Sequence, residues 1–186
     1  MSEEMIIQYC SPTLAGLKTG NMFTCAFEDE DALRNTVRDF NRRYSHKGIC
    51  LLSLRFMNGK ALIYTYRPAY LARDLKHETA RSILKNNGYN PDLPGRCISC
   101  LREKLMNCDS FPHEIGLFLG YPPEDVKGFM DHGAKCCKCS GCWKVYSDEA
   151  KALNAFRKFG KCREIYCRKY AEGYSVDKLI VNIQEI

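Results

Sequence analysis

Apolar residues recur at helical spacing in the stretch 28–48, EDEDALRNTVRDFNRRYSHKG. Four of them would lie on one face of a helix: Leu33, Val37, Phe40 and Tyr44. Acidic residues open the stretch and basic residues close it, as the helix dipole favours, and Gly48 stands where a helix would end. The pattern therefore predicts an amphipathic helix.

Two runs rich in β-branched and aromatic residues flank Asn58 and Gly59 in the stretch 49–68, ICLLSLRFMNGKALIYTYRP. Because the Asn-Gly pair favours a two-residue type I′ turn, this stretch is predicted to form a β-hairpin. The expected register opposes Phe56 to Ala61, Leu54 to Ile63, Arg55 to Leu62 and Ser53 to Tyr64. The first two pairs are expected on a buried face and the other two on a partly wet face.

Helical patterns dominate the rest of the chain. Helices are predicted within 77–88, 96–108, 111–133 (two short ones) and 147–173, the last interrupted near Gly160. A short strand is predicted at 142–147, and the alternating run 178–186, KLIVNIQEI, is predicted to be an edge strand. Pro12, Gly16 and Gly20 punctuate residues 10–27 too often for one long element, so this part is expected to be irregular.

This order of elements favours an α+β fold over alternating βαβ units. We expect a single domain over residues 1–186, with a central β-hairpin, a helix-rich second half and a short C-terminal strand. Residues 1–27 would form an irregular N-terminal segment of the same domain. A chain of 186 residues is long enough to bury one core of this kind.

The composition is globular, with 45% hydrophobic and 27% charged residues. No run approaches the roughly 18 apolar residues of a membrane-spanning helix, and the acidic start MSEEMIIQYC lacks the features of a secretory signal. We therefore expect a cytoplasmic protein without membrane insertion. The net charge of +6 is spread without a run of five or more basic residues, which is typical of a solvated surface, so nucleic acid is not the expected partner.

The chain contains 12 cysteines, and a reducing cytosol favours metal binding or catalysis over disulfides. Three cysteines are isolated and are expected to pack as small core residues: Cys10, Cys25 and Cys50. Six others gather in and beside two C-x-x-C pairs: Cys97, Cys100, Cys136, Cys137, Cys139 and Cys142.

Two C-x-x-C turns could complete a four-thiolate site for zinc or hold an iron–sulfur cluster. We predict metal ligands at Cys97, Cys100, Cys136, Cys139 and Cys142. Nearby lysines, namely Lys135, Lys138 and Lys144, are expected to lower the thiol pKa values, which would suit metal capture and thiol redox chemistry alike. Redox thiols and simple packing remain as alternatives.

His113 and Glu114 open the stretch HEIGL, which resembles the zinc-protease motif H-E-x-x-H. Leu117 occupies the position of the second histidine, so the protease interpretation fails. The pair could still bind a metal or shuttle a proton. Alternatively, Glu114 favours a helix N-terminus and His113 fills a polar niche.

Two basic residues are further candidates. Arg67 stands beside Tyr64 and Tyr66, a setting that suits an anion or a base, or a salt bridge or stacking partner inside the fold. Lys18, in PTLAGLKTGN, lies among glycines that could cradle the phosphate of a cofactor, although the P-loop spacing is missing.

The motifs PTLAGLKTGNMF, ALIYTYRP, FPHEIGLFLGYPPEDVKGFM and GCWKVYSDE resemble those of a family of small proteins from anaerobic, mainly clostridial, bacteria, a domain of unknown function. The resemblance spans the chain from about Cys10 to the final run. It implies no established activity, and it implies an iron or redox setting through neighbouring ferrous-iron uptake and flavodoxin-like genes. Family members carry fewer cysteines before WKVY, so a four-sulfur cage would be a speciality of this member. The family motifs point to a candidate surface of His113, Glu114, Arg67, Lys18 and Trp143.

Three functions remain open from the sequence. The leading one is a cytoplasmic accessory protein that binds a transition metal or an iron–sulfur cluster, with a redox or iron-transport protein as partner. The second is an enzyme for a small anionic substrate, in which His113 is the acid/base, Glu114 lies beside it and Arg67 holds the anion. The third is a binding module for protein or nucleic acid that uses the positive charge.

Overall fold

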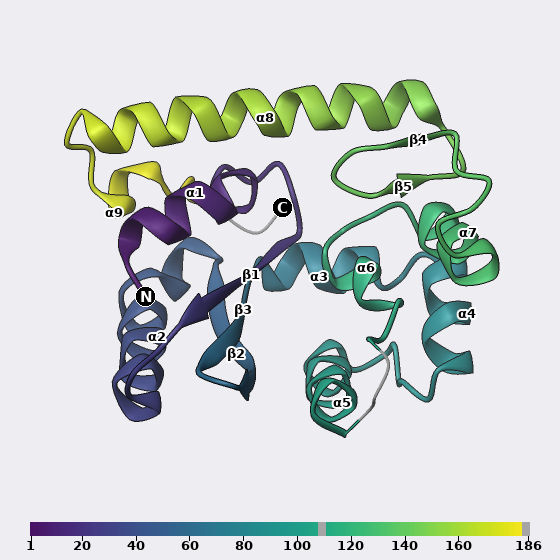
Figure 1. Ribbon diagram of the computed structural model, residues 1–186, viewed down its shortest axis with the longest axis horizontal. Helices are drawn as coiled ribbons and strands as arrows, with labels where there is room; N and C mark the ends of the chain where they lie inside the picture. The colour runs from purple at the N-terminus through teal and green to yellow at the C-terminus, as the bar shows by residue number, and fades with distance from the viewer. Residues whose placement is uncertain (108–110, 184–186) are drawn as a thin grey trace. The chain divides into compact units, whose positions relative to one another are not determined.

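The structure of this chain is a computed structural model that describes residues 1–107 and 111–183 (Figure 1). Its contacts group the chain into two compact units: unit 1, Met1–Ala69 with Phe159–Ile186, and unit 2, Tyr70–Lys158. Helices occur together with a small antiparallel sheet, which confirms the predicted α+β class. Within the described ranges, no helix combines the length and the apolar character needed to cross a membrane.

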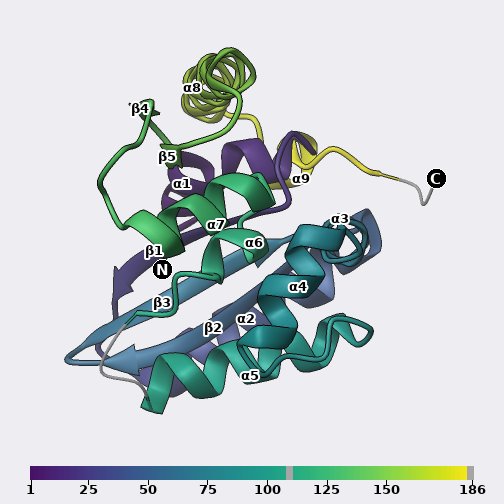
Figure 2. The same cartoon turned by 90° about the vertical axis from the view of Figure 1, so that its right-hand side faces the viewer.

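Unit 1 is built on a three-stranded antiparallel sheet, in which β3 (Lys60–Tyr66) lies between β1 (Gly20–Ala26) and β2 (Cys50–Met57) (Figure 2). Helix α1 (Glu3–Leu14) contacts β1, and α2 (Glu30–Tyr44) contacts β2. Residues from both helices and all three strands share one hydrophobic core, for example Leu14, Phe23, Phe40, Leu51 and Ile63.

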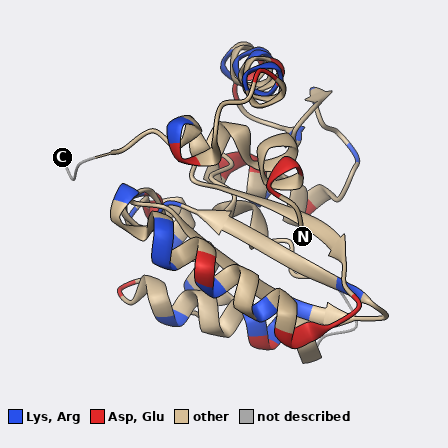
Figure 3. Ribbon diagram, turned by 90° about the vertical axis from the view of Figure 1, so that its left-hand side faces the viewer, with Lys and Arg blue, Asp and Glu red and all other residues tan. Residues whose placement is uncertain are grey.

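Helix α2 is the helix expected from the periodic pattern. Its four predicted core positions are all buried. Asp29 caps its start by accepting a hydrogen bond from the backbone N–H of Asp31 at 2.8 Å. Acidic residues lie in its first turn and basic residues in its last (Figure 3), and the short 3₁₀ helix η1 (Ser45–Lys47) ends at Gly48, where φ is +71°.

The predicted hairpin is confirmed. Asn58 and Gly59 both have positive φ, 50° and 68°, as a type I′ turn requires. Next to the turn the register is the expected one, with Phe56 opposite Ala61 and with Arg55 opposite Leu62.

Beyond these pairs, the register of β2 shifts at a bulge between Ser53 and Arg55. Ser53 therefore opposes Ile63, and the predicted pairs of Leu54 with Ile63 and of Ser53 with Tyr64 are wrong. A bulge inserts one extra residue into one strand. Leu54, which lies at the bulge, is only 1% exposed.

The N-terminal segment is not irregular, as residues 1–27 hold α1 and β1. The Ser2 hydroxyl caps α1 by accepting from the backbone N–H of Met5 at 3.3 Å. Pro12 lies in the last turn of α1. Strand β1 begins at Gly20, opposite Tyr66 of β3. The local turn signals did not reveal this strand, because it is formed by pairing with a distant part of the chain.

The predicted C-terminal strand is also wrong in its described part, and residues 184–186 lie outside the described residues. Val176–Leu179 form the short helix α9, preceded by Ser175, and 180–183 contain no strand. Val176, Leu179 and Ile180 are buried in the unit 1 core. Their spacing places them on one face of a helical turn, so burial favours the turn over an exposed edge strand.

Unit 2 is mainly helical, and its elements are these: the end of α3 (Pro68–Asp74), α4 (Glu78–Asn86), α5 (Pro94–Asn107), α6 (Ile115–Phe118), α7 (Pro123–His132), β4 (Cys139–Ser140), β5 (Lys144–Val145) and the start of α8 (Glu149–Ala171). Helical patterns were expected from residue 69 onward, so helices were predicted in all the helical regions. The strand predicted at 142–147 is shorter, since β5 covers only Lys144–Val145, and β4 was not predicted. The expected interruption at Gly160 is wrong, because α8 runs through it. One glycine costs a helix only about 1 kcal/mol relative to alanine.

Candidate functional site

Unit 2 contains an open cavity of about 390 Å³, here called the aromatic pocket. Its walls come from the segment before α6, from α6 and α7, and from the β4–β5 turn. The lining residues are Phe111, His113, Ile115, Gly116, Tyr121, Asp125, Val126, Phe129, Trp143 and Lys144. Apolar and aromatic walls with few polar groups, at this volume, are typical of small-molecule sites.

Trp143 forms one wall and is held on several sides. Its indole Nε1–H donates to Asp125 Oδ2 at 2.7 Å. Its ring stacks on Tyr121, with centroids 5.0 Å apart, and the ring of Phe156 meets it edge-on at 4.5 Å. The indole is therefore oriented before any ligand enters.

Asp125, in the first turn of α7, is the buried anchor of this wall, with only 2% of its surface exposed. Its Oδ1 accepts three further hydrogen bonds, each of 2.8 Å, from the backbone N–H groups of Tyr146 and Ser147 and from the Ser147 hydroxyl. Burial alone would raise the pKa of Asp125, but these bonds and the one from Trp143 outweigh it and lower the pKa below the usual 3.8. The carboxylate ties α7 to the β5 segment.

Three glycines let backbone and rings approach closely around the pocket. A Cβ on Gly116 would lie 2.8 Å from the Val126 side chain, and a Cβ on Gly128 would lie 2.5 Å from the Tyr146 ring. A Cβ on Gly141 would overlap the ring of Phe156. The shape of the pocket therefore depends on these positions having no side chain.

His113 lies at the mouth of the aromatic pocket. Its side chain is exposed, and its ring meets Phe129 edge-on, with centroids 4.9 Å apart. The predicted acid/base residue is thus accessible to a bound molecule.

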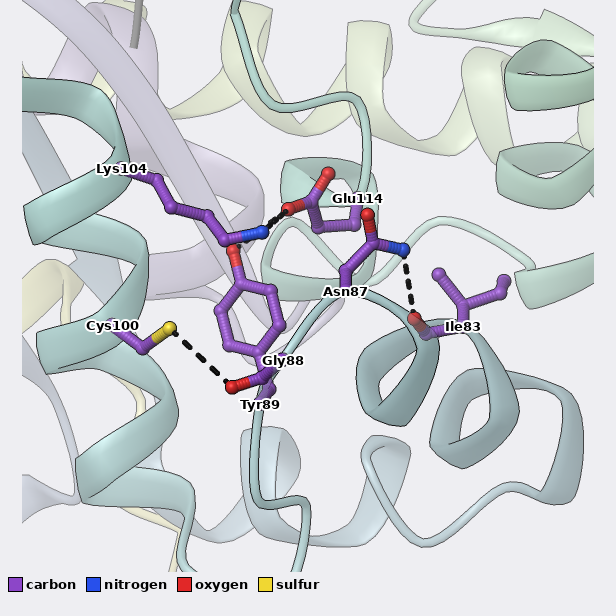
Figure 4. A network of polar contacts seen from close by, with 7 residues as sticks. All are labelled: Ile83, Asn87, Gly88, Tyr89, Cys100, Lys104 and Glu114. Atoms are coloured by element: carbon purple, nitrogen blue, oxygen red, sulfur yellow. Dashed lines mark hydrogen bonds and ion pairs between the residues drawn. The ribbon is translucent and has the colours of Figure 1, made fainter. Parts of the chain in front are cut away.

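Glu114 points elsewhere, into a buried network with Tyr89 and Lys104 (Figure 4). Its Oε1 accepts from the Tyr89 hydroxyl and from Lys104 Nζ, both at 2.9 Å, and Glu114 is 3% exposed. Burial raises the pKa of Tyr89, and the Glu114 carboxylate raises it further, so the phenol stays a donor. Lys104 Nζ also lies 4.6 Å from the centre of the Tyr89 ring.

Beside this network lies a second, smaller cavity of about 270 Å³, here called the polar pocket. It is lined by Asn87, Lys104, Phe111, Pro112, His113, Glu114 and Met130. Phe111 and His113 belong to both cavities, so the polar pocket adjoins the aromatic one.

Arg67 lies in unit 1 and is 1% exposed. Its guanidinium donates to the backbone carbonyls of Thr13, Lys47, Leu14 and Val181, at 2.7 to 3.1 Å. These bonds join the end of α1 to the segments before β2 and after α9. A guanidinium enclosed in this way stabilises the fold through its hydrogen bonds, and it presents almost no surface to an anionic substrate.

Lys18 also lies in unit 1 and is 8% exposed. Burial raises the pKa of the Cys10 thiol to about 12, and the positive charge of Lys18 offsets only a part of this increase. A phosphate-binding role for Lys18 stays a prediction.

The first cysteine pair lies on α5 and faces the loop around Tyr89. Cys97 Sγ donates to the carbonyl of Asn90 at 3.0 Å, and Cys100 Sγ lies 4.0 Å from that of Gly88. Burial, with a smaller contribution from Cys100, raises the pKa of Cys97 to about 11. Burial raises the pKa of Cys100 as well, so both thiols are protonated near neutral pH and are poor nucleophiles.

The second group surrounds the β4–β5 turn, where Cys136 and Cys142 are exposed and Cys137 and Cys139 are partly buried. The expected lowering of the thiol pKa by lysine is wrong for Cys139, because burial and then the Glu149 carboxylate raise it.

Among the residues that the structure describes, no three histidine, cysteine, aspartate or glutamate side chains converge as a metal site. The cage expected from Cys97, Cys100, Cys136, Cys139 and Cys142 is therefore not assembled in this structure. Metal or cluster binding by these thiols stays a prediction. The packing expected of Cys10 and Cys25 is confirmed, since they are 0% and 2% exposed, while Cys50 is partly buried.

The sequence pointed to His113, Glu114 and Trp143 but missed the other rings of the aromatic pocket. These rings belong to the stretch 111–133, which was predicted to form two short helices. Phe111 begins the stretch, Tyr121 lies between the helices and Phe129 lies in the second one. A cluster of aromatic residues near proline-marked helix ends was the available signal. It does not distinguish a cavity wall from core packing.

A family model described as "Protein of unknown function (DUF3793)" matches residues 6–180. Among curated proteins and among solved structures, nothing matches the chain.

Proposed function

Because the chain belongs to the DUF3793 family, whose description assigns no activity, we propose a function from the site itself: unit 2 binds a small organic molecule with a flat aromatic body. The observation that carries this proposal is the aromatic pocket. Its volume of about 390 Å³ suits a ligand of one or two fused rings.

The oriented walls support the proposal. Trp143 is held by Asp125 and stacked on Tyr121, so that little side-chain entropy is lost when a ligand stacks against it. A flat ring bound in the pocket would contact the aromatic side chains that line it, among them Trp143 and Phe129, and would gain aromatic contacts beyond the burial of its area.

The three-residue catalytic set expected from the sequence is not the basis of this proposal. His113 lines the aromatic pocket, but Glu114 is engaged by Tyr89 and Lys104, and Arg67 is enclosed by backbone carbonyls of unit 1. The metal-binding function expected from the sequence rests on the cysteine pattern alone. Metal analysis of protein purified without oxygen tests it.

The test uses Trp143, which is the only tryptophan of the chain. 2-Acetonaphthone, a flat two-ring ketone, is titrated into the protein while the Trp143 emission and the heat of binding are recorded. We expect saturable quenching with one site. Phe129→Ala should weaken binding roughly tenfold, since it removes one aromatic wall.

The matched control is Leu153→Ala, which changes a 44% exposed residue of unit 2 outside the pocket. It should bind the ketone like the unchanged protein. Absence of saturable binding, or equal weakening by both substitutions, would rule out the aromatic pocket as the site.

A further inference from the structure

Glu114 is a buried carboxylate whose side-chain hydrogen bonds to the described residues all end on one of its two oxygens. Both of its hydrogen bonds, from Tyr89 and from Lys104, end on Oε1. In the described part of the chain, no fully enclosed side-chain nitrogen or oxygen lacks a hydrogen-bond partner, so Oε2 is not fully enclosed. Glu114 lines the polar pocket, and Figure 4 shows its second oxygen directed away from Lys104.

The charge at this point is already balanced. The ion pair of Glu114 with Lys104 is 2.9 Å long, and the Glu114 side chain is only 4% exposed. A second cation would compete with Lys104 for one carboxylate, whereas a neutral N–H group would complete its hydrogen bonds without adding charge.

Donors for a carbonyl oxygen stand in the same pocket. Lys104 Nζ has three N–H bonds, and the Asn87 amide uses one of its two on the carbonyl of Ile83 at 2.9 Å. The polar pocket thus combines acceptor oxygens, Glu114 Oε2 and Asn87 Oδ1, with the N–H donors of Lys104 and Asn87. A primary carboxamide carries both the N–H donors and the carbonyl acceptor that match this set.

We propose that the ligand of unit 2 is an aromatic primary carboxamide, whose ring occupies the aromatic pocket and whose amide enters the polar pocket and donates to Glu114 Oε2. This inference rests on the proposed function, because it requires that the aromatic pocket binds the ring of the ligand. His113 and Phe111, which border both cavities, mark the passage from ring to amide.

The test compares 2-naphthamide with 2-acetonaphthone by calorimetry. The two have nearly the same shape and differ in an NH₂ group against a CH₃ group. We expect the amide to bind roughly tenfold more tightly, as a hydrogen bond to a charged acceptor predicts. N,N-dimethyl-2-naphthamide, which has no N–H, should bind no better than the ketone.

Glu114→Gln locates the effect. Because Tyr89 and Lys104 both donate to one oxygen, the single oxygen of glutamine should stay with them, and its NH₂ group should take the place of Oε2. The NH₂ group of the glutamine would then face the NH₂ group of the ligand, and neither can accept a hydrogen bond from the other. The preference for the amide should therefore disappear while the ketone still binds. Tyr89→Phe changes only the Oε1 side and should keep the preference.

The outcomes separate the two proposals. If neither naphthyl compound binds, the proposed function fails. If both bind with equal affinity, or if Glu114→Gln keeps the amide preference, the aromatic pocket stands and the carboxamide inference is overturned. The comparison of the primary amide with the ketone of nearly the same shape uses the unchanged protein, so it can overturn the inference even if the glutamine variant does not fold.

Discussion

Trp143 and Asp125 are joined by a hydrogen bond of 2.7 Å from the indole Nε1–H to the buried carboxylate. The bond links the β4–β5 turn to the first turn of α7 and orients the tryptophan wall of the aromatic pocket. One contact thus serves both the stability of unit 2 and the geometry of its pocket.

We expect Asp125→Ala to destabilise unit 2 by about 3 kcal/mol, because it leaves several buried N–H groups without an acceptor. Chemical unfolding followed by Trp143 emission measures the change. Asp131→Ala is the matched control on the same helix, and its exposed pair with Lys127 should contribute less than about 1 kcal/mol. Equal effects of the two substitutions would contradict the anchoring role of Asp125.

The same carboxylate predicts an acid transition. Since its pKa is lower in the folded protein than the usual 3.8, its contribution to stability is complete above that value and is lost as the pH falls toward the folded pKa. We expect the free energy of unfolding to fall below about pH 4, and to fall less steeply in Asp125→Asn, whose amide does not titrate. Parallel pH curves for the two proteins would exclude Asp125 as the titrating group.

Two glycine-to-alanine substitutions should change the free energy of unfolding in opposite directions. Gly141→Ala forces the Phe156 ring away from Trp143 and should destabilise unit 2 by about 1–3 kcal/mol. Gly160→Ala has open space around the new methyl group, inside α8, and should stabilise the protein by roughly 0.5–1 kcal/mol. Thermal unfolding checks both, and a shift of Trp143 emission is expected for the first alone.

Arg67→Met should destabilise unit 1 by about 3 kcal/mol or more, since it removes the donors of four backbone carbonyls. Arg67→Lys should recover only a part, because an ammonium cannot reproduce the planar fork. Urea unfolding followed by circular dichroism measures both, with Arg42→Ala, whose side chain is 77% exposed, as control. A fully stable methionine variant would show that the carbonyl contacts contribute little.

Cysteine reactivity should follow burial. At pH 8 iodoacetamide should modify the exposed Cys136 and Cys142 first, whereas Cys10 and Cys97, with pKa values raised to about 12 and about 11, should react only on unfolding. Mass spectrometry of digested samples over time gives the order. Early modification of Cys97 would contradict the packing of α5 against the Tyr89 loop.

Local patterns were sufficient for much of the fold. The apolar stripe and charges of α2 are properties of neighbouring residues, and so is the turn at Asn58 and Gly59. The bulge beside Leu54, the strand β1 and the helix α9 were missed, because each is stabilised by partners distant in the chain. Local signals describe what a segment favours by itself, and tertiary burial selects among those options.

For the site, residue types by themselves determined that the chain carries a conspicuous cysteine group, an adjacent His113 and Glu114, and one tryptophan. Only the tertiary structure separated His113 from Glu114, enclosed Arg67 among carbonyls, left the cysteine cage unassembled and gathered scattered rings into a pocket. The physical reason is that a site depends on side-chain direction and on distance in space. Spacing along the chain specifies neither once loops and helix ends intervene.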